Sequence, residues 1–483
     1  MSTKSPLNGA NEKKTNYRWV ICSMLFFATT VNYLDRQVLS LTWKDFIAPE
    51  FHWTNNDYGN ITAIFSIIYA LSMLFAGKFI DWMGTKKGFL WAIGVWSAGA
   101  CLHAICGVAT EWMVDLPDAE ALRNVAAGTE LASKIAFISV SLFIFARFVL
   151  AVGEAGNFPA AIKTTAEYFP KKDRAFATSI FNAGATVGAL AAPVTIPFIA
   201  KMFGWEMAFI IIGALGFLWM GIWIFVYNKP TECKHVNKAE LAYINQDQDN
   251  PAEYQNVEVE PKKLSFLKCF SFKQTWAFAF GKFMTDGVWW FFLFWTPAYF
   301  SEVYGLDSTE SAPYIFVLYM ITMLSIAGGY LPTFFVDKKG MEPYAGRMRA
   351  MLIFAFFPLL ALLAQPLGSY SIWIPTIIIG IAGAAHQSWS ANIFSTIGDM
   401  FPKSAIATIT GIGGMAGGVG SFLINKGSGL LFDHAQTSNM KFMGFEGIES
   451  GYFIIFCICG VAYLIGWSVM KLLVPKVEPI VIE

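Results

Sequence analysis

Twelve long apolar runs constrain this chain more than any other feature of its sequence. A helix needs about 20 apolar residues to cross the roughly 30 Å hydrocarbon layer of a bilayer. Of the 483 residues, 55% are hydrophobic and only 14% are charged, whereas a soluble domain has about 25% charged residues. The sequence therefore predicts an all-α membrane protein. It excludes a large soluble enzyme, a disordered chain and a nucleic-acid binder with a basic surface. The runs are 18–43, 57–81, 88–110, 135–158, 174–200, 206–228, 272–301, 311–336, 347–364, 370–396, 404–432 and 450–473.

The runs form two sets of six, and the two halves share short motifs. GKFIDWMGTKKG at 77–88 resembles GYLPTFFVDKKG at 329–340, and EYFPK at 167–171 resembles DMFPK at 399–403. The offset between the halves falls by 24 residues between these anchors, the length of an extra polar segment at 111–134. We therefore expect two six-helix pseudo-repeats, a plan common among secondary transporters. The predicted parts are a tail (1–17), a bundle (18–228) with the 111–134 insertion on its outer side, a linker (229–271), a second bundle (272–473) and a tail (474–483).

Basic residues predict how the chain lies in the membrane. Lys and Arg gather in the N-terminal tail, in alternate loops and in the linker, and the opposite loops contain few of them. By the positive-inside rule, both termini and the linker are expected in the cytoplasm. No signal-peptide pattern is found, and the seven cysteines lack the spacing of a disulfide framework or a zinc site. We expect no metal, no cofactor and no nucleic-acid partner, and a monomer in the lipid bilayer.

Four charged residues lie inside the apolar runs, where each costs about 2.5–3.5 kcal/mol on insertion scales. They are Asp35 and Arg36 in the first run, and Arg147 and Glu154 in the fourth. Arg147 and Glu154 are two helical turns apart and share one face, whereas Asp35 and Arg36 need not point the same way. A static ion-pair network would explain them. So would a binding site, because a guanidinium binds a carboxylate anion and a neighbouring acid can take up a proton in response.

The second half supplies polar and aromatic groups instead of charges. The tenth run contains His386, Gln387, Trp389, Ser390 and Asn392. His386, Trp389 and Ser390 lie at i, i+3 and i+4, on one helix face. Such amide, hydroxyl and indole groups suit a polyhydroxylated ligand, although interhelical packing explains them equally well.

Three other runs contribute candidate residues. Trp289 lies beside Asp286, Trp290 and Trp295 in the seventh run. This cluster can stack on a sugar ring or belong to an aromatic belt. Tyr69 in the second run and Asn182 in the fifth are further candidates for a central cavity. The sequence GIGGMAGGVGS at 411–421 predicts close helix packing or bending.

These motifs resemble a known family of transporters. GKFIDWMGTKKG is similar to the loop motif between the second and third helices of the major facilitator superfamily. NYLDR and RFVLAVGEAGNFPA are similar to its anion:cation symporter branch. Within that branch, FNAGATVGALAAP, GWEMAFIIIGALGFLWMGIWIFVYNKP and GIAGAAHQSWSANIF resemble the bacterial hexuronate transporters. The resemblance implies the major facilitator fold and an inner-membrane symporter that imports galacturonate or glucuronate with protons.

The resemblance also assigns roles to residues. It implies that Asp35 and Glu154 carry protons, that Arg36 meets the substrate carboxylate, and that Arg147 tunes Glu154 or contacts the anion. Tyr69 matches a substrate-contacting tyrosine. Together with Asn182, Trp289, His386, Gln387, Trp389, Ser390 and Asn392, these residues form the predicted binding site. Gly77, Asp81, Gly84, Lys86 and Lys87 form the predicted conformational-switch loop.

Several alternatives stay open from the sequence. The substrate can be another organic anion, such as an aldonate, an aldarate or a phosphate ester. Relatives that carry aldonates have a glutamine where this chain has Ala185, which favours a hexuronate. A second set of cavity cations would favour a divalent substrate, and Lys163 and Lys282 lie near expected span ends. A uniporter would not need the two carboxylates. A membrane enzyme or sensor is disfavoured, because the five histidines show no catalytic or metal-ligand spacing and no signalling domain is attached.

Overall fold

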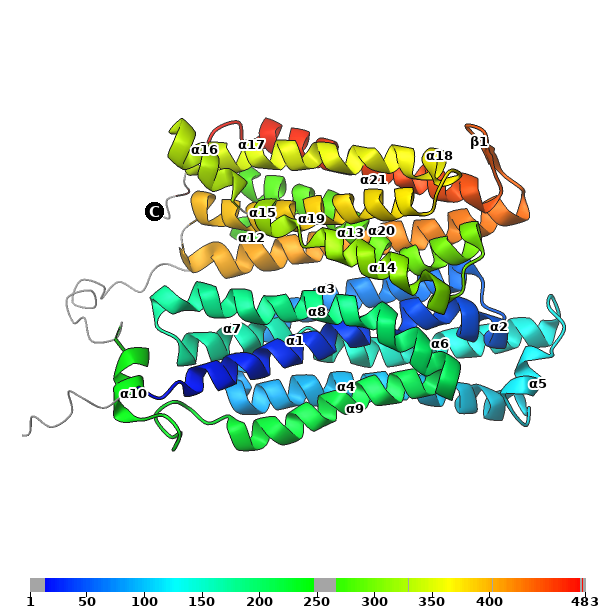
Figure 1. The fold of residues 1–483 in the computed structure, drawn as a ribbon, viewed down its shortest axis with the longest axis horizontal. Helices are drawn as coiled ribbons and strands as arrows, with labels where there is room; N and C mark the ends of the chain where they lie inside the picture. Colours follow the sequence, from blue (N-terminus) through cyan, green and yellow to red (C-terminus); the bar gives the residue numbers. More distant parts are fainter. Residues whose placement is uncertain (1–13, 247–265, 329, 402, 478–479, 481–483) are drawn as a thin grey trace, which may run out of the picture.

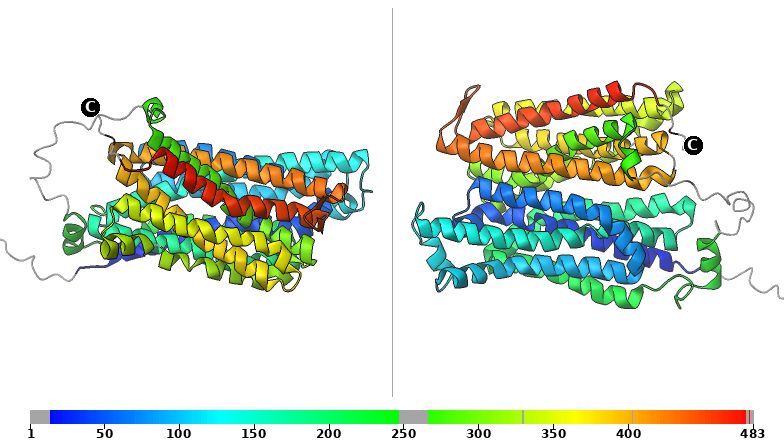
Figure 2. Two further views of the ribbon diagram at one scale, coloured as in Figure 1. Left: turned by 90° about the horizontal axis from the view of Figure 1, so that it is seen from above. Right: turned by 180° about the vertical axis from the view of Figure 1, so that it is seen from behind.

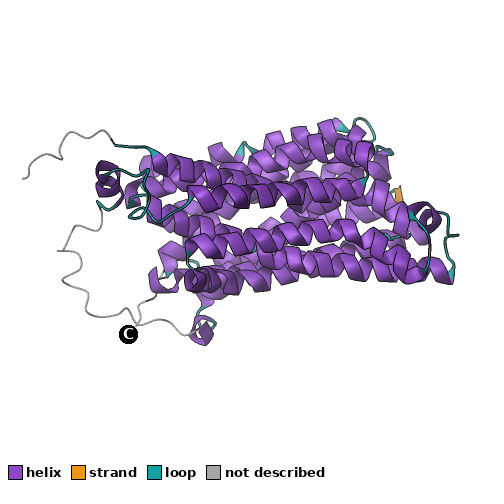
Figure 3. Cartoon of the chain, turned by 90° about the horizontal axis from the view of Figure 1, so that it is seen from below, coloured by secondary structure: helices purple, strands orange, loops and turns teal. Residues whose placement is uncertain are grey.

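The helices are stacked in two bundles that lie side by side (Figures 1 and 2). The computed structural model describes residues 14–246, 266–328, 330–401, 403–477 and 480. In these residues the only sheet is a hairpin, β1 (Lys441–Phe442) and β2 (Phe445–Glu446), and helices make up nearly all the rest (Figure 3). We refer to the two ends of the molecule as the α10 end and the α5 end, after the short helices found there.

The first bundle contains the helices before residue 230. They are α1 (Tyr17–Thr42), the π-helical η1 (Trp43–Ile47), α2 (Ala48–Phe51), α3 (Asn55–Met83), α4 (Thr85–Val114), α5 (Ala119–Arg123), α6 (Glu130–Glu154), α7 (Asn157–Tyr168), α8 (Lys171–Phe203) and α9 (Trp205–Val226). The helix α10 (Lys238–Ile244) follows in the linker.

The second bundle follows the short helix α12 (Phe266–Cys269). It contains α13 (Lys273–Tyr304), α14 (Ser308–Thr322), α15 (Ser325–Gly328), α16 (Leu331–Lys339), α17 (Pro343–Phe356), the 3-10 helix η2 (Phe357–Leu363), α18 (Ala364–Gly368), α19 (Trp373–Met400), α20 (Lys403–Thr437) and α21 (Ile448–Leu473).

Each predicted run corresponds to a helix or to a broken helix. The eighth run is built from α14, α15 and α16, and the ninth from α17, η2 and α18. Within the described residues, seven helices are both long and strongly apolar enough to span a membrane. The helices α1, α13 and α19 are not among these seven. They carry most of the candidate site residues. The 111–134 insertion begins with the last turn of α4 and ends with the first turn of α6, and its own helix, α5, is only five residues long.

The glycine-rich run lies in α20, which packs along α3 of the other bundle. A Cβ atom added to Gly418 would lie 2.2 Å from the Cβ of Ala70, and one added to Gly59 would lie 2.8 Å from the carbonyl oxygen of Asn425. Backbones this close leave no room for a side chain. The predicted close packing is therefore confirmed, and it joins the two bundles.

Both copies of the repeated loop motif end a helix at a glycine with positive φ. When Asp81 is matched with Asp337, Gly84 corresponds to Gly340. Gly84 follows α3 with φ of 78°, and Gly340 follows α16 with φ of 62°. Glycine adopts positive φ without the steric penalty that a Cβ brings. The two glycines differ in ψ, which is 153° at Gly84 and 26° at Gly340, so the positive φ is the feature that they share.

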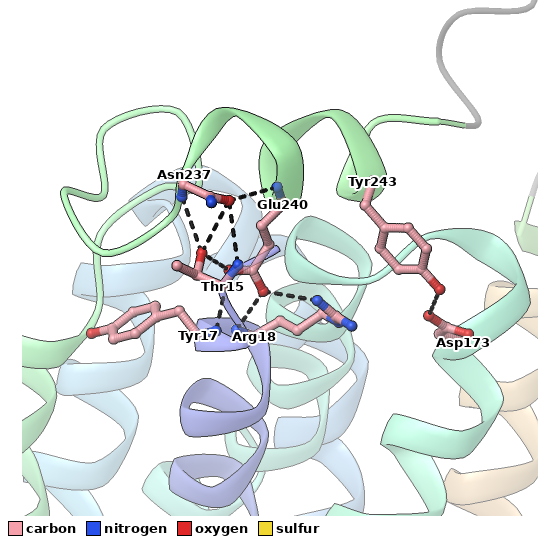
Figure 4. Close-up of polar contacts among 7 residues, drawn as sticks. All are labelled: Thr15, Tyr17, Arg18, Asp173, Asn237, Glu240 and Tyr243. Carbon is pink, nitrogen blue, oxygen red and sulfur yellow. Dashed lines mark hydrogen bonds and ion pairs between the residues drawn. The ribbon is translucent and has the colours of Figure 1, made fainter. Parts of the chain in front are cut away.

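At the α10 end, the linker is fastened to the first bundle (Figure 4). The buried carboxylate of Glu240 in α10 accepts hydrogen bonds from the backbone N–H groups of Tyr17 and Arg18, each at 3.2 Å. It also forms an ion pair of 2.9 Å with the Arg18 guanidinium. Tyr243 adds a hydrogen bond of 2.7 Å to Asp173 in α8. Because helix N-terminal N–H groups attract negative charge, Glu240 acts as the cap of α1.

At the α5 end, several polar contacts join the two bundles. Asp433 of α20 accepts hydrogen bonds from the backbone N–H groups of Asn55 (2.8 Å) and Asn56 (2.7 Å) at the start of α3. The Tyr58 hydroxyl donates to the carbonyl of Phe294, at 2.8 Å. Lys44 of η1 also pairs with Glu302 of α13. The bundles are therefore closed against each other at this end.

Candidate functional site

The centre of the candidate site is an ion pair between Arg36 of α1 and Glu154 of α6. The Arg36 Nε and Nη2 atoms lie 3.0 and 2.6 Å from Glu154 Oε2. Both side chains are buried, with 5% and 0% of their surface exposed. Both contacts use the same carboxylate oxygen, and Glu154 Oε1 has no hydrogen-bond partner among the described residues. The pair is thus not the parallel two-oxygen fork that Arg can form with a carboxylate.

Aromatic rings surround the Arg36 guanidinium. Its Cζ atom lies 4.7 Å from the ring centre of Tyr69 and 5.2 Å from those of Tyr33 and Trp290. Trp290 belongs to α13 in the second bundle. Arg36 therefore lies where the two bundles meet, on the side of the first bundle that faces the second.

The other two buried charges lie nearby but make fewer contacts. Asp35 is 1% exposed, and neither of its carboxylate oxygens has a hydrogen-bond partner among the described residues. It lies within electrostatic range of Arg147 and Glu154. Arg147 packs on Phe65, with Cζ 5.3 Å from the ring centre, and its Nη1 has no such partner either. Of the two adjacent residues Asp35 and Arg36, only Arg36 pairs with Glu154.

In the second bundle, His386 lies between two aromatic side chains. Its ring stacks on Trp289 with 5.2 Å between ring centres, and its Nδ1 lies 2.7 Å from the Tyr463 hydroxyl. Trp389 is fully buried, and its Nε1 has no partner among the described residues. Gln387 and Ser390 are partly buried on the same helix, α19. These groups form a second polar region, next to Trp290 along α13.

Other predicted residues lie apart from these two regions. Asn392 donates to the carbonyl of Ser388, one turn away in its own helix, and lines a cavity of about 350 Å³ with Asp337 and Arg347. Asn182 is exposed on α8. Gly184, two residues later, faces α1 instead, because a Cβ atom added to it would lie 2.3 Å from the carbonyl oxygen of Phe26.

The residues of the predicted switch loop lie at the α10 end. Gly77 and Asp81 belong to α3, Gly84 ends that helix, and Lys87 is exposed in α4. Lys86 donates a 3.2 Å hydrogen bond to the side chain of Asn228, which follows α9. The Asp81 side chain lies outside the described part of the structure.

The sequence reasoning missed three features of the site. It chose Trp289, whereas its neighbour Trp290 contacts Arg36, and it did not single out Tyr33. It also placed Lys282 near the end of a span. Lys282 is instead buried, nine residues after the start of α13, and it forms an ion pair of 2.8 Å with Asp286. The i, i+4 spacing of Lys282 and Asp286 was a sequence signal for this pair.

Among the described residues, no group of three or more His, Cys, Asp or Glu side chains could hold a metal ion. The site instead offers a guanidinium, carboxylates and aromatic faces between two helical bundles. The sequence matches the profile of the Major Facilitator Superfamily over residues 25–424. The chain belongs to the major facilitator superfamily. A major facilitator protein is a multi-pass membrane transporter and not an enzyme, as the sequence predicted.

Relatives and solved structures agree with this family. The chain is 28% identical over 421 residues to the hexuronate transporter of Escherichia coli, covering 86% of this chain and 88% of that protein. It is 24% identical over 465 residues to the probable galactarate/D-glucarate transporter GarP of Escherichia coli, covering 94% and 97%. A crystal structure of a bacterial homologue of the human lysosomal transporter Spinster has the same fold. Its TM-score is 0.66 at 18% identity, over 96% of this chain and 97% of that one.

Proposed function

We propose that this major facilitator transporter imports a hexuronate, galacturonate or glucuronate, together with protons. The observation that carries the proposal is the buried Arg36–Glu154 pair at the junction of the two bundles. The similarity to a hexuronate transporter supports this choice of substrate. Its similarity to an aldarate transporter keeps another organic anion as the alternative.

The proposed coupling follows from competition for Arg36. A hexuronate carboxylate binds Arg36 and takes over its contacts with Glu154 Oε2. Glu154 then loses the cation that stabilises its charge in a dry environment, so it takes up a proton. Binding of the anion and binding of the proton therefore favour each other. Asp35, which lacks a hydrogen-bond partner in the described structure, is the second candidate proton carrier.

The second bundle supplies the other side of the binding site in this proposal. Trp290 and Tyr69 flank Arg36, so the sugar ring can stack beside the bound carboxylate. His386 and Gln387 lie on the neighbouring helix and offer hydrogen-bonding groups to the ring hydroxyls. Transport then proceeds by alternating access, with the bundles rocking about this site.

The proposed orientation places the α10 end in the cytoplasm of a bacterial inner membrane. Lys86 and Lys87 lie at this end, as do Lys338 and Lys339 in the repeated motif, in agreement with the positive-inside rule. The contacts of Asp433 with Asn55 and Asn56 then close the outer side.

The test is uptake of labelled galacturonate and glucuronate by purified protein in liposomes, with the lumen alkaline. Glu154→Gln should lose accumulation driven by the pH gradient but keep exchange of preloaded substrate. Glu130→Gln, the same change on an exposed residue of the same helix, should behave as wild type. Accumulation that survives Glu154→Gln would remove Glu154 from the coupling step. Absence of uptake of both acids by folded wild type would reject the hexuronate assignment.

A further inference from the structure

The second bundle contains an ion pair between a buried lysine and a partly buried aspartate that the proposed mechanism does not use. Lys282 Nζ lies 2.8 Å from Asp286 Oδ2, one turn apart on α13, with 6% and 15% of the side chains exposed. Lys282 Nζ also lies 4.3 Å from the ring centre of Phe394 on α19. Charges inside a membrane protein usually face a partner or an internal cavity. Here the two charges cancel each other.

The surrounding backbone is shaped to hold Asp286. A Cβ atom on Gly417 of α20 would lie 2.2 Å from Asp286 Oδ2. Only glycine at position 417 therefore leaves space for the carboxylate in its observed position. The next residue, Gly418, contacts α3 of the first bundle. The Asp286 carboxylate thus occupies a slot beside the helix that joins the two bundles.

The pair lies next to the proposed substrate site. Asp286, Trp289 and Trp290 follow at i, i+3 and i+4, so they share one face of α13. Trp290 contacts Arg36, and Trp289 stacks on His386, which lies within electrostatic range of Lys282. One helical turn, roughly 6 Å along the axis, separates Asp286 from Trp290. A six-carbon acid bound to Arg36 by one carboxylate therefore has its far end near this pair.

We propose that the Lys282–Asp286 pair selects the charge of the substrate's far end. This inference rests on the proposed function, because it assumes that Arg36 holds the first carboxylate. Hexuronates and aldarates differ at the far end, where a hexuronate carries an uncharged carbonyl or hemiacetal carbon and an aldarate a second carboxylate. Asp286 neutralises Lys282 and repels a second carboxylate, while both side chains can bond to hydroxyl groups. The pair therefore admits hexuronates and excludes aldarates.

Removing the acid from the pair should reverse the preference. Asp286→Asn leaves Lys282 as an uncompensated buried cation, which attracts a second carboxylate. Removing both charges in Lys282→Met/Asp286→Asn takes this attraction away again. The double variant should therefore lose the increased affinity for galactarate that the single variant gains. A general loosening of the fold would not produce this dependence of one substitution on the other.

The experiment measures inhibition of labelled galacturonate exchange by unlabelled galactarate and by unlabelled galacturonate in liposomes. In Asp286→Asn, the half-inhibitory concentration of galactarate, divided by that of galacturonate, should fall by roughly tenfold or more. It should return toward the wild-type ratio in the double variant. Asp118→Asn, the same change at an exposed site in the 111–134 insertion, is the matched control, and size-exclusion profiles in detergent check folding.

Three results would overturn the inference. They are strong inhibition of wild type by galactarate, an unchanged ratio in folded Asp286→Asn, and a double variant that keeps the shifted ratio. If Asp286→Asn does not fold, Lys282→Met replaces it, and this variant must exclude galactarate at least as well as wild type. If wild type exchanges galacturonate but the inhibition ratios of the variants do not change as expected, only this inference is rejected. Wild type that exchanges neither acid rejects the proposed function and, with it, this inference.

Discussion

Arg36 of α1 and Glu154 of α6 meet through a single carboxylate oxygen, Glu154 Oε2. Two guanidinium donors converge on that oxygen, a geometry that the ammonium group of lysine cannot reproduce. Arg36→Lys should therefore reduce galacturonate uptake in liposomes by roughly tenfold or more, although the charge is kept. Arg123→Lys is the matched control, because Arg123 pairs with Glu50 at the α5 end at a similar 2.6 Å. Equal uptake by both variants would contradict the role of Arg36.

Asp433 caps α3 from the opposite bundle, so its loss should weaken closure of the α5 end. We expect Asp433→Ala to add a population with a wider separation between spin labels at positions 112 and 370, measured by pulsed EPR. Trp112 and Tyr370 are 84% and 81% exposed, one in each bundle, and the native cysteines would be replaced. Asp57→Ala is the control, since Asp57 caps the same helix with Thr54 inside one bundle. Identical distance distributions in the two variants would refute the gating role.

Gly418 tests how closely the bundles need to pack. Gly418→Ala places a methyl group 2.2 Å from the Cβ of Ala70, and such overpacking costs about 1–3 kcal/mol. The variant should lower the thermal unfolding temperature in detergent and slow transport. Gly427→Ala in the same helix meets nothing within 4 Å and should leave both unchanged. A Gly418→Ala protein with wild-type stability and transport rate would show that the interface between α20 and α3 accommodates the added methyl group.

Glu240 joins α10 to the start of α1 through buried contacts. Removing one partner of a buried ion pair costs about 3–5 kcal/mol, so Glu240→Ala should release α10 and fray the first turn of α1. Hydrogen exchange at residues 14–20 should become faster, whereas Glu232→Ala, an exposed change in the same linker, should not alter it. Protection that persists in Glu240→Ala would mean that the remaining contacts, such as Thr15–Asn237 and Tyr243–Asp173, hold α10 without Glu240.

The sequence predicted the helical fold well because each apolar run carries its own signal. The charged residues of the first and fourth runs were also recognisable, since few residues of this kind occur inside a membrane. The pairing of Arg36 with Glu154 was not recognisable from the sequence, because 118 residues separate them. The contact of Trp290 with Arg36 was missed for a related reason. Adjacent residues point about 100° apart on a helix, and only the packing of α13 decides which one reaches the other bundle.

The fastening of α10 changes what connects the two bundles. With Glu240 anchored to α1, the chain passes from one bundle to the other through residues 245–265, between α10 and α12. The contacts of α20 with α3, and not the continuity of the peptide chain, then hold the halves in register. A gene divided within this segment should yield two polypeptides that find each other in the bilayer and reassemble into a working carrier.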